Sequence, residues 1–354
     1  MKKSKYKIIL AALIMAISFI PNSETNSQEK FSAQKTNFVT GKVPDDITKY
    51  AKDVFKMLID KECLTTKSKN LHLCKPFLTN SKNSIDIYKF LIKDDKEVIS
   101  SLMIINDKNT QSLKWQLNEG KTLNNIKEKI SKGGTYKLSI KKTNSEDVSE
   151  LVFEKVTDKS VKSVSSITDE ISTVEIKKDN ITFREIDYPL PYPDERILYF
   201  NPKEVQINNS WCAAYVGATI LSHGMGKDIR AYNIMRWAYP DMEYSSLLKK
   251  GISDSKLISY AKSMGSNPYY VNYALTRTEI MDEIIAKRMI YAGCKNVYRN
   301  SYHAMLVYGY KKDVSYKVWN PWGEYYTIPM SSNDIYAHDD SHYYWTDSIK
   351  NWTD

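Results

Sequence analysis

The sequence has few cysteines, no apolar segment of membrane length and no dense cluster of basic residues. Four cysteines in 354 residues cannot supply the disulfide framework that is typical of small secreted domains. No apolar run approaches the roughly 20 residues that a membrane-spanning helix needs. The net charge of +9 comes from scattered lysines and not from a basic patch interleaved with aromatic residues. These absences argue against a disulfide scaffold, an integral membrane protein and a nucleic-acid-binding protein.

The N-terminus has the layout of a secretory signal peptide. A lysine-rich start is followed by an apolar run from Ile8 to Ile20, and the run ends at Pro21. These 13 residues are too few for a comfortable membrane anchor, and no lipid-modifiable cysteine follows them. We therefore expect a secreted, extracellular protein that has no membrane attachment once residues 1–27 have been removed.

Composition divides the rest of the chain into two parts. Six of the seven tryptophans lie beyond residue 191, and that part has 18 basic and 17 acidic side chains, so its net charge is +1. Residues 158–195 are rich in Ser, Thr, Lys and Asp and contain three closely spaced prolines, as exposed and protease-sensitive segments often do. We predict an N-terminal domain over residues 28–190 and a C-terminal domain over residues 191–354, with the boundary within 158–195.

The N-terminal domain has the patterns of a mixed α+β fold with a mainly antiparallel sheet. Apolar residues at helical spacing predict helices that begin at Asp45 or Asp46, over Ser84–Ile92 and over Leu123–Ile130. Short apolar segments predict strands over residues 101–105, 112–117, 136–140, 151–156 and 181–186. The only histidine of this domain is His72, and we find no set of residues in it that could carry catalysis.

Four residues of the C-terminal domain together have the chemistry of a thiol hydrolase. Cysteine is a strong nucleophile only as the thiolate, and a free thiol with a pKa of about 8.5 needs a base to reach that form near neutral pH. Cys212 begins a run of small residues that predicts a helix start, where the helix dipole favours a thiolate. His303 can take the proton, and Asn320 can hold the imidazole in one tautomer. The amide of Gln206 can donate to an oxyanion beside the backbone N–H of the cysteine.

The segments that carry the histidine and the asparagine have the pattern of a β-hairpin. Residues 303–310 alternate like a strand, 311–313 form a turn and 316–319 form the partner strand. The hairpin would bring His303 and Asn320 side by side although they are 17 residues apart. Apolar spacing also predicts a helical layer, with helices over residues 228–239, 253–264 and 278–287 and extended chain from residue 289.

Each of these residues also has an ordinary structural explanation. A cysteine among alanines is commonly a small buried residue, and an asparagine before proline is commonly a turn residue. We expect such a buried structural role for Cys294, which lies in an apolar run, while Cys63 and Cys74 can be either free or bridged. The order of the four candidate residues, their local context and the exported chain together favour the hydrolase.

Three stretches resemble papain-type cysteine proteases, and more closely the compact bacterial staphopain family. They are Asn208–Tyr215, the Trp-Asn-Pro-Trp run of residues 319–322 and the closing run of residues 342–345. The 91 residues from Cys212 to His303 fall short of the roughly 130 or more that are typical of papain and cathepsin chains. This short spacing fits the staphopain family. The resemblance is strong over residues 200–350 and faint before them.

The resemblance implies a cysteine endopeptidase with a papain-like domain, in which a helical half faces an antiparallel β half. It implies catalytic roles for Cys212, His303 and Asn320, an oxyanion role for Gln206 and a supporting role for Trp322, which would cover the bond between Asn320 and His303. Residues 28–190 would be an inhibitory prodomain that proteolysis removes. The expected partners are protein or peptide substrates and a small inhibitor of the staphostatin type, with no cofactor and no metal.

Two other functions remain open at this point. An exported Cys-His amidase or endopeptidase that acts on the cell wall would use the same thiolate chemistry. A catalytically inactive binding module would keep the residues without the geometry. The N-terminal domain could likewise be an independent adhesion or binding module.

Overall fold

The computed structural model describes residues 36–39, 43–64, 66, 68–82, 84–142, 149–156, 164–166, 168–176, 192–337 and 341–352. The predicted signal peptide, the predicted strand over residues 181–186 and most of the predicted linker lie outside these ranges. Within them, no helix combines the length and the apolar character that crossing a membrane requires.

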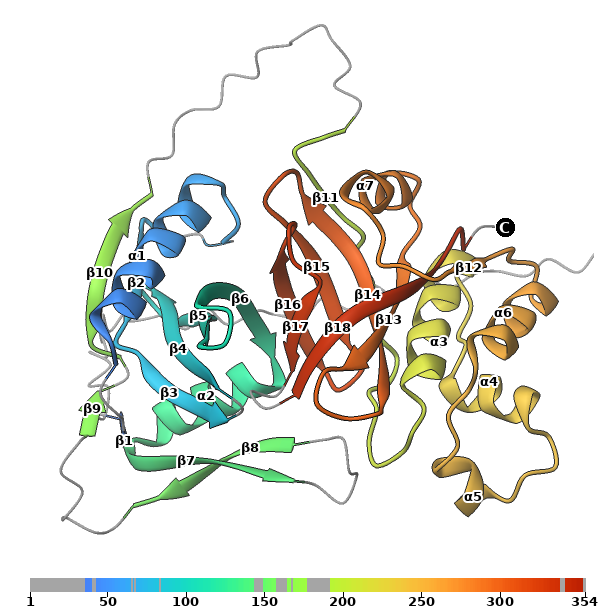
Figure 1. Ribbon diagram of the computed structural model, residues 1–354, viewed down its shortest axis with the longest axis horizontal. Helices are drawn as coiled ribbons and strands as arrows, with labels where there is room; N and C mark the ends of the chain where they lie inside the picture. Colours follow the sequence, from blue (N-terminus) through green and yellow to red (C-terminus); the bar gives the residue numbers. More distant parts are fainter. Residues whose placement is uncertain are drawn as a thin grey trace, which may run out of the picture. The chain divides into compact units, whose positions relative to one another are not determined.

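The described residues form seven helices and 18 strands (Figure 1). The helices are α1 (Asp45–Asp60), α2 (Lys121–Lys132), α3 (Cys212–Met225), α4 (Ala231–Ala238), α5 (Tyr244–Leu248), α6 (Asp254–Ser263) and α7 (Arg277–Ile285). The strands of the N-terminal part are β1 (Thr36–Val39), β2 (Asn70–Cys74), β3 (Phe77–Lys82), β4 (Ile85–Asp94), β5 (Val98–Asp107), β6 (Ser112–Gly120), β7 (Gly134–Lys142), β8 (Ser149–Lys155), β9 (Val164–Ser166) and β10 (Glu170–Glu175). Those of the C-terminal part are β11 (Glu195–Ile197), β12 (Tyr269–Val271), β13 (Ile290–Asn296), β14 (Tyr302–Lys311), β15 (Ser315–Asn320), β16 (Glu324–Pro329), β17 (Asp334–Ala337) and β18 (Ser341–Lys350).

Most of the strands belong to one 14-stranded sheet that runs through both parts of the chain. Its order is β10-β2-β4-β5-β6-β16-β15-β14-β13-β18-β12, with β3 beside β4, β11 beside β14 and β17 beside β18. A second sheet has the order β8-β7-β1-β9. The pairs are antiparallel except for the β1–β7 pair, and the predicted α+β class is confirmed.

The predicted helix over Ser84–Ile92 is wrong, because these residues form strand β4. Its side chains alternate between two cores: Tyr88, Phe90 and Ile92 lie in one buried cluster, and Ile85 and Ile87 lie in another. A strand buried on both faces is apolar at nearly every position, so its sequence does not reveal the period of two.

The other helix predictions for described residues are confirmed within a few positions. The helix predicted from Asp45 or Asp46 is α1, and α2 buries Leu123 and Ile126. At the end of α6, Gly265 has a φ of +100°, a conformation that favours glycine and stops the helix.

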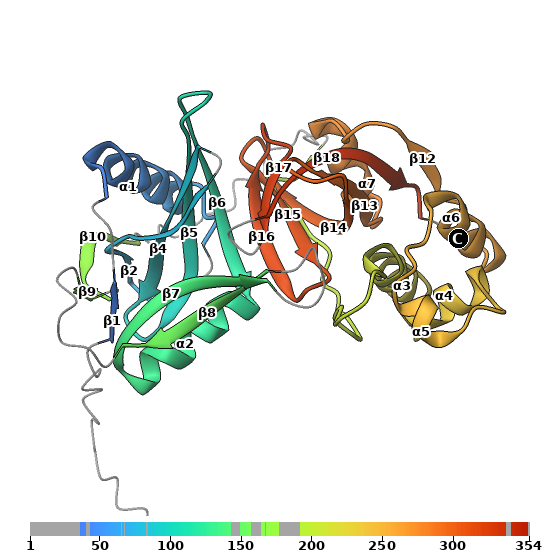
Figure 2. The same ribbon diagram turned by 60° about the horizontal axis from the view of Figure 1, so that its bottom comes forward.

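The C-terminal part has a helical layer and an antiparallel sheet, which share one buried core. Helices α3, α4 and α6 pack on one another, and α3 also packs against β13 and β14 (Figure 2). Close packing of α3 depends on Gly217, where an added Cβ would lie 2.5 Å from a methyl carbon of Leu257 on α6. Gly217 therefore lets α3 pack closely against α6.

Candidate active site

Cys212 is the first residue of helix α3 and is half-buried. Two hydrogen bonds of Trp211 fix the preceding loop. Its backbone N–H donates to Asn209 Oδ1 at 3.1 Å, and its indole N–H donates to the carbonyl of Leu247 on α5 at 2.7 Å. The unpaired N–H groups at a helix start favour a negative charge. This position therefore favours a thiolate at Cys212.

The other three cysteines are free and buried. Burial raises the pKa of the Cys63 thiol, raises that of Cys74 to about 12 and raises that of Cys294 well above its ordinary value. Cys63 and Cys74 belong to different buried clusters and do not form the disulfide that the sequence left open. The expectation that Cys294 is a buried thiol is confirmed, and Cys212 is the most accessible of the four.

His303 and Asn320 meet across the β14–β15 hairpin, as predicted. The imidazole Nε2 of His303 lies 2.9 Å from Oδ1 of Asn320. The same oxygen accepts the backbone N–H of Trp322 at 3.1 Å, and Nδ2 of Asn320 donates to the hydroxyl of Tyr326 at 3.2 Å. Because Oδ1 can only accept, it selects the imidazole tautomer or cation that carries hydrogen on Nε2. A proton exchange with a thiol would therefore use the other ring nitrogen, Nδ1.

Two aromatic rings enclose the imidazole. The indole of Trp322 stacks on His303 with ring centroids 4.1 Å apart and an interplanar angle of 24°. The ring of Tyr343 on β18 lies 5.3 Å from His303. Asn320 is fully buried and His303 is only 5% exposed, so water is largely kept from the bond between them. A hydrogen bond held in such surroundings is electrostatically stronger than one in water.

Gln206 is tied to the turn that follows Asn320. Its backbone N–H donates to the carbonyl of Pro321 at 2.7 Å, and its side-chain Nε2 donates to the carbonyl of Asn209 at 2.7 Å. The second hydrogen on Nε2 can serve another acceptor. The side chain is therefore positioned by its neighbours within the loop that leads to Cys212.

Strand β13 lies next to the strand that carries His303 and packs against the helix that begins with Cys212. Cys294 on β13 pairs with His303 on β14 in the sheet register. Burial is the main cause of the raised pKa of Cys294 and of Tyr291, but the charge of Cys212 also raises both. Cys212 therefore lies within electrostatic range of β13, and α3 packs against both strands. Cys212 and His303 are 91 positions apart in sequence, but they lie near the starts of α3 and β14, which pack against each other.

Two residues of the site were not predicted from the sequence. Tyr326 on β16 supports the amide of Asn320, and Tyr343 contacts the imidazole. Tyr343 lies in the closing run of residues 342–345, which resembles staphopains, but the resemblance did not predict a role for this residue. Tyr326 had no signal, because its contact depends on the register of β15 with β16.

Replacing Asn320 with alanine should lower stability. The change leaves the Trp322 N–H without its buried acceptor, removes the acceptor of His303 and opens a small cavity. A buried group that loses its partner costs about 1–3 kcal/mol, and we expect a total loss of about 2–4 kcal/mol in the free energy of unfolding. Urea unfolding measures this loss. Asn300→Ala, at an exposed position, should change stability by less than about 0.5 kcal/mol. Equal stability of the two variants would contradict a structural role for the amide.

Comparison with known proteins finds similarity to staphopain peptidases. Residues 193–352 match the family model described as staphopain peptidase C47. Staphopain A of Staphylococcus aureus strain MRSA252 is 26% identical to the chain over 394 aligned residues, which cover 99% of both proteins. An extracellular cysteine protease of Staphylococcus epidermidis is 27% identical over 169 residues, which cover 42% of this chain and 92% of that protein. The similarity to staphopain A thus includes the N-terminal part, where the sequence resemblance was faint.

Proposed function

We infer that this chain, whose residues 193–352 form a staphopain-like cysteine peptidase domain, is a secreted cysteine endopeptidase that is made as a zymogen and uses Cys212 as its nucleophile. The observation that carries the assignment is the bond of 2.9 Å between His303 and Asn320 beside the helix that begins with Cys212. It supports a Cys-His-Asn arrangement in which each residue has one role.

In the proposed reaction, His303 accepts the thiol proton of Cys212 and the thiolate attacks the carbonyl carbon of a peptide bond. The Gln206 amide and the backbone N–H of Cys212 stabilise the resulting oxyanion. The imidazolium then protonates the leaving amine, and the C–N bond breaks to give a thioester. Water, deprotonated by His303, hydrolyses the thioester and the thiol is restored.

The enclosed imidazole supports this mechanism. Asn320 can accept a hydrogen bond from His303 in both the neutral and the protonated state, so the ring does not need to move between the two half-reactions. Trp322 restricts the access of water to that bond. We propose Trp322 as a positioning residue that acts through His303.

We propose that residues 1–27 are a signal peptide, residues 28–190 a prodomain and residues 191–354 the peptidase, with activation cleavage between residues 158 and 195. Strand β11 supports this boundary, because it pairs with β14 and continues in a hydrogen bond of 2.8 Å from Leu198 N–H to the Tyr308 carbonyl. A cut before Glu195 leaves this strand in the peptidase. N-terminal sequencing of secreted active enzyme tests the proposal, and an intact prodomain on fully active protein would contradict it.

The test of the function is to incubate the processed protein with casein and with purified cell wall, each with and without a thiol alkylator. We expect alkylator-sensitive cleavage of casein and no release of cell-wall fragments. Release of cell-wall fragments alone would identify a cell-wall hydrolase, and inactivity on both substrates would identify a binding module.

A small protein inhibitor of the staphostatin type in the producing cell is a further proposed partner. This proposal rests on the family resemblance alone. Affinity capture on processed enzyme that carries Cys212→Ala would test it, and the absence of any small protein bound in a defined ratio would contradict it.

A further inference from the structure

The proposed prodomain and peptidase share a continuous sheet. Strand β6 pairs with the edge of β16 in antiparallel register, from Leu117 opposite Thr327 to Gly120 opposite Glu324 (Figures 1 and 2). The other edge of β16 pairs with β15, which carries Asn320. Prodomain strand β6 therefore covers what would otherwise be an open strand edge of the peptidase.

Tyr336 on β17 is held by the prodomain through both its ring and its backbone. The ring is 3% exposed and packs in a cluster with Ile85, Ile87, Met103 and Ile105, which come from β4 and β5. Buried aromatic anchors of this kind often dominate the binding energy of an interface. The ring therefore provides the apolar part of the contact.

The amide of Gln116 on β6 hydrogen-bonds the backbone of Tyr336 twice. Nε2 donates to the carbonyl at 2.8 Å, and Oε1 accepts the N–H at 3.0 Å. Gln116 is only 1% exposed, so separation of the two parts would break both bonds. The pair of bonds also fixes the position of β6 along β17, since a shifted strand could not make both.

The carboxylate of Glu324 accepts hydrogen bonds from the first turn of helix α2. The carboxylate is 2% exposed and accepts the backbone N–H of Thr122 at 2.8 Å and its hydroxyl at 2.7 Å, in the first turn of the helix. The N–H of Lys121 donates to the carbonyl of Gly323 at 3.2 Å. Gly120, with a φ of +102°, allows this approach, because an added Cβ would lie 2.5 Å from the Gly323 carbonyl oxygen. A carboxylate at a helix N-terminus is favoured by both the N–H groups and the dipole.

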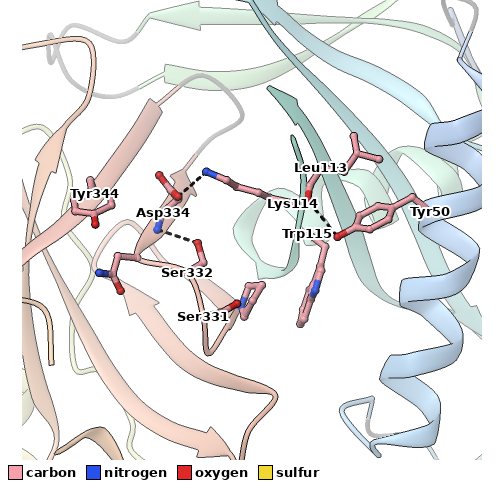
Figure 3. A pocket seen from close by; sticks show the side chains of 10 residues that line it. Tyr50, Leu113, Lys114, Trp115, Ser331, Ser332, Asp334 and Tyr344 are labelled. Carbon is pink, nitrogen blue, oxygen red and sulfur yellow. Dashed lines mark hydrogen bonds and ion pairs between the residues drawn. The ribbon is translucent and has the colours of Figure 1, made fainter. Parts of the chain in front are cut away.

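An ion pair closes the other end of the contact. Nζ of Lys114 on β6 lies 2.7 Å from the carboxylate of Asp334 on β17 (Figure 3). The same carboxylate lies 2.6 Å from Nε2 of His342. Beside this pair is a cavity of about 410 Å³, which residues of the prodomain and of the peptidase line. Burial opposes ionisation of Asp334, but the hydrogen bonds from His342 and Lys114 outweigh it and lower the pKa of Asp334 to about 2. The pair therefore persists at the mildly acidic pH of many extracellular sites.

We propose that this contact, with Tyr336 and Glu324 as its main peptidase residues, keeps the prodomain bound as a separate chain after the linker is cut, so that linker cleavage alone yields a latent non-covalent complex. The proposal rests on the zymogen function proposed above. The contacts named involve residues 85–122 of the prodomain and none of the linker. Activation would then need a second cut inside the prodomain, which destroys its fold and uncovers β16.

The test uses the full-length chain with Cys212→Ala, which cannot digest itself. Brief trypsin treatment is used to cut the chain only within residues 177–190, and mass spectrometry confirms the position of the cut. Size-exclusion chromatography then shows whether the two fragments remain bound to each other. We expect both fragments to elute together at micromolar concentration. Separation of the fragments of the nicked chain would overturn the proposal.

Two variants test the residues. Tyr336→Ala should raise the dissociation constant of the nicked complex roughly 30-fold or more, and Glu324→Gln should raise it about tenfold. Tyr199→Ala, at a ring that is 85% exposed, and Glu97→Gln, at an ion pair within the prodomain, are matched controls that should leave it unchanged. If Tyr336→Ala does not fold, the dissociation constant of the nicked Glu324→Gln complex alone tests the proposal. Binding by Glu324→Gln as tight as that of the controls would assign the contact elsewhere and overturn the proposal.

A casein assay separates the failure of this proposal from the failure of the function. The nicked chain that retains Cys212 should stay inactive until the prodomain is digested. Casein cleavage by a nicked complex that has not dissociated would overturn the latency. Fragments that separate and give an active peptidase would contradict the proposed retention of the prodomain, but they would leave the protease function intact. A complex that persists while the digested enzyme remains inactive would instead contradict the protease function.

Discussion

Cys212→Ala is expected to abolish the cleavage of casein by the processed enzyme, with a loss of kcat/KM on the order of 10⁴-fold or more. Alanine supplies no nucleophile, and residual rate enhancement from binding and oxyanion stabilisation is small in comparison. The variant should stay folded, because alanine is the best helix former and the site is half-buried at the start of α3. Kinetics with a quenched peptide substrate and a thermal melt measure both properties.

Alkylation provides the control for this result. Iodoacetamide should label one thiol in the processed enzyme and none in the variant, since Cys294 is buried and Cys63 and Cys74 belong to the proposed prodomain. Activity of Cys212→Ala within tenfold of the unchanged enzyme would refute the assignment. Loss of activity together with loss of the folded state would point to a structural cysteine.

His303→Gln should lower kcat/KM by roughly 10²–10⁴-fold, which is the range that a positioned general acid and base contributes. Glutamine can still bond Asn320, so the fold should survive, but it cannot exchange a proton with the thiol. The variant therefore separates proton transfer from packing.

The pH dependence of alkylation tests the role of the imidazole directly. A thiolate paired with an imidazolium is present between the pH at which the thiol ionises and the higher pH at which the imidazolium loses its proton. Without the imidazole, the rate should follow ordinary thiol ionisation and rise through about pH 8.5. We expect reaction in the mildly acidic range in the unchanged enzyme and its loss in His303→Gln. The same pH profile in both proteins would rule out His303 as the partner of Cys212.

Where one local pattern dominated, the sequence was a reliable guide. The helix starting at Asp45, the small residues after Cys212 and the alternation from His303 each follow from spacing within a few turns or residues of chain. Strand β4 was mistaken for a helix because both of its faces are buried, and apolar residues on both faces fit either period. Only the neighbours of a segment reveal that both faces are covered.

The candidate site shows the same division. The identities of Gln206, Cys212, His303 and Asn320 could be chosen from residue chemistry, order and local context. The contacts of Tyr326 and Tyr343 with that set arise from strands that come later in the chain. Sheet register is set by many side chains at once, so no single stretch of sequence predicts such pairs.

By itself, the sequence determined the chemistry: a thiol, an imidazole and two amides in an order and local context that fit a thiol hydrolase, together with a charge division that separates two parts of the chain. The tertiary structure decided what surrounds that chemistry. Covalent identity fixes what a group can donate or accept, whereas burial and partners depend on which distant segments pack together. The fold places Asn320 out of the reach of water, stacks Trp322 on His303 and joins β6 to β16 through Gln116 and Glu324.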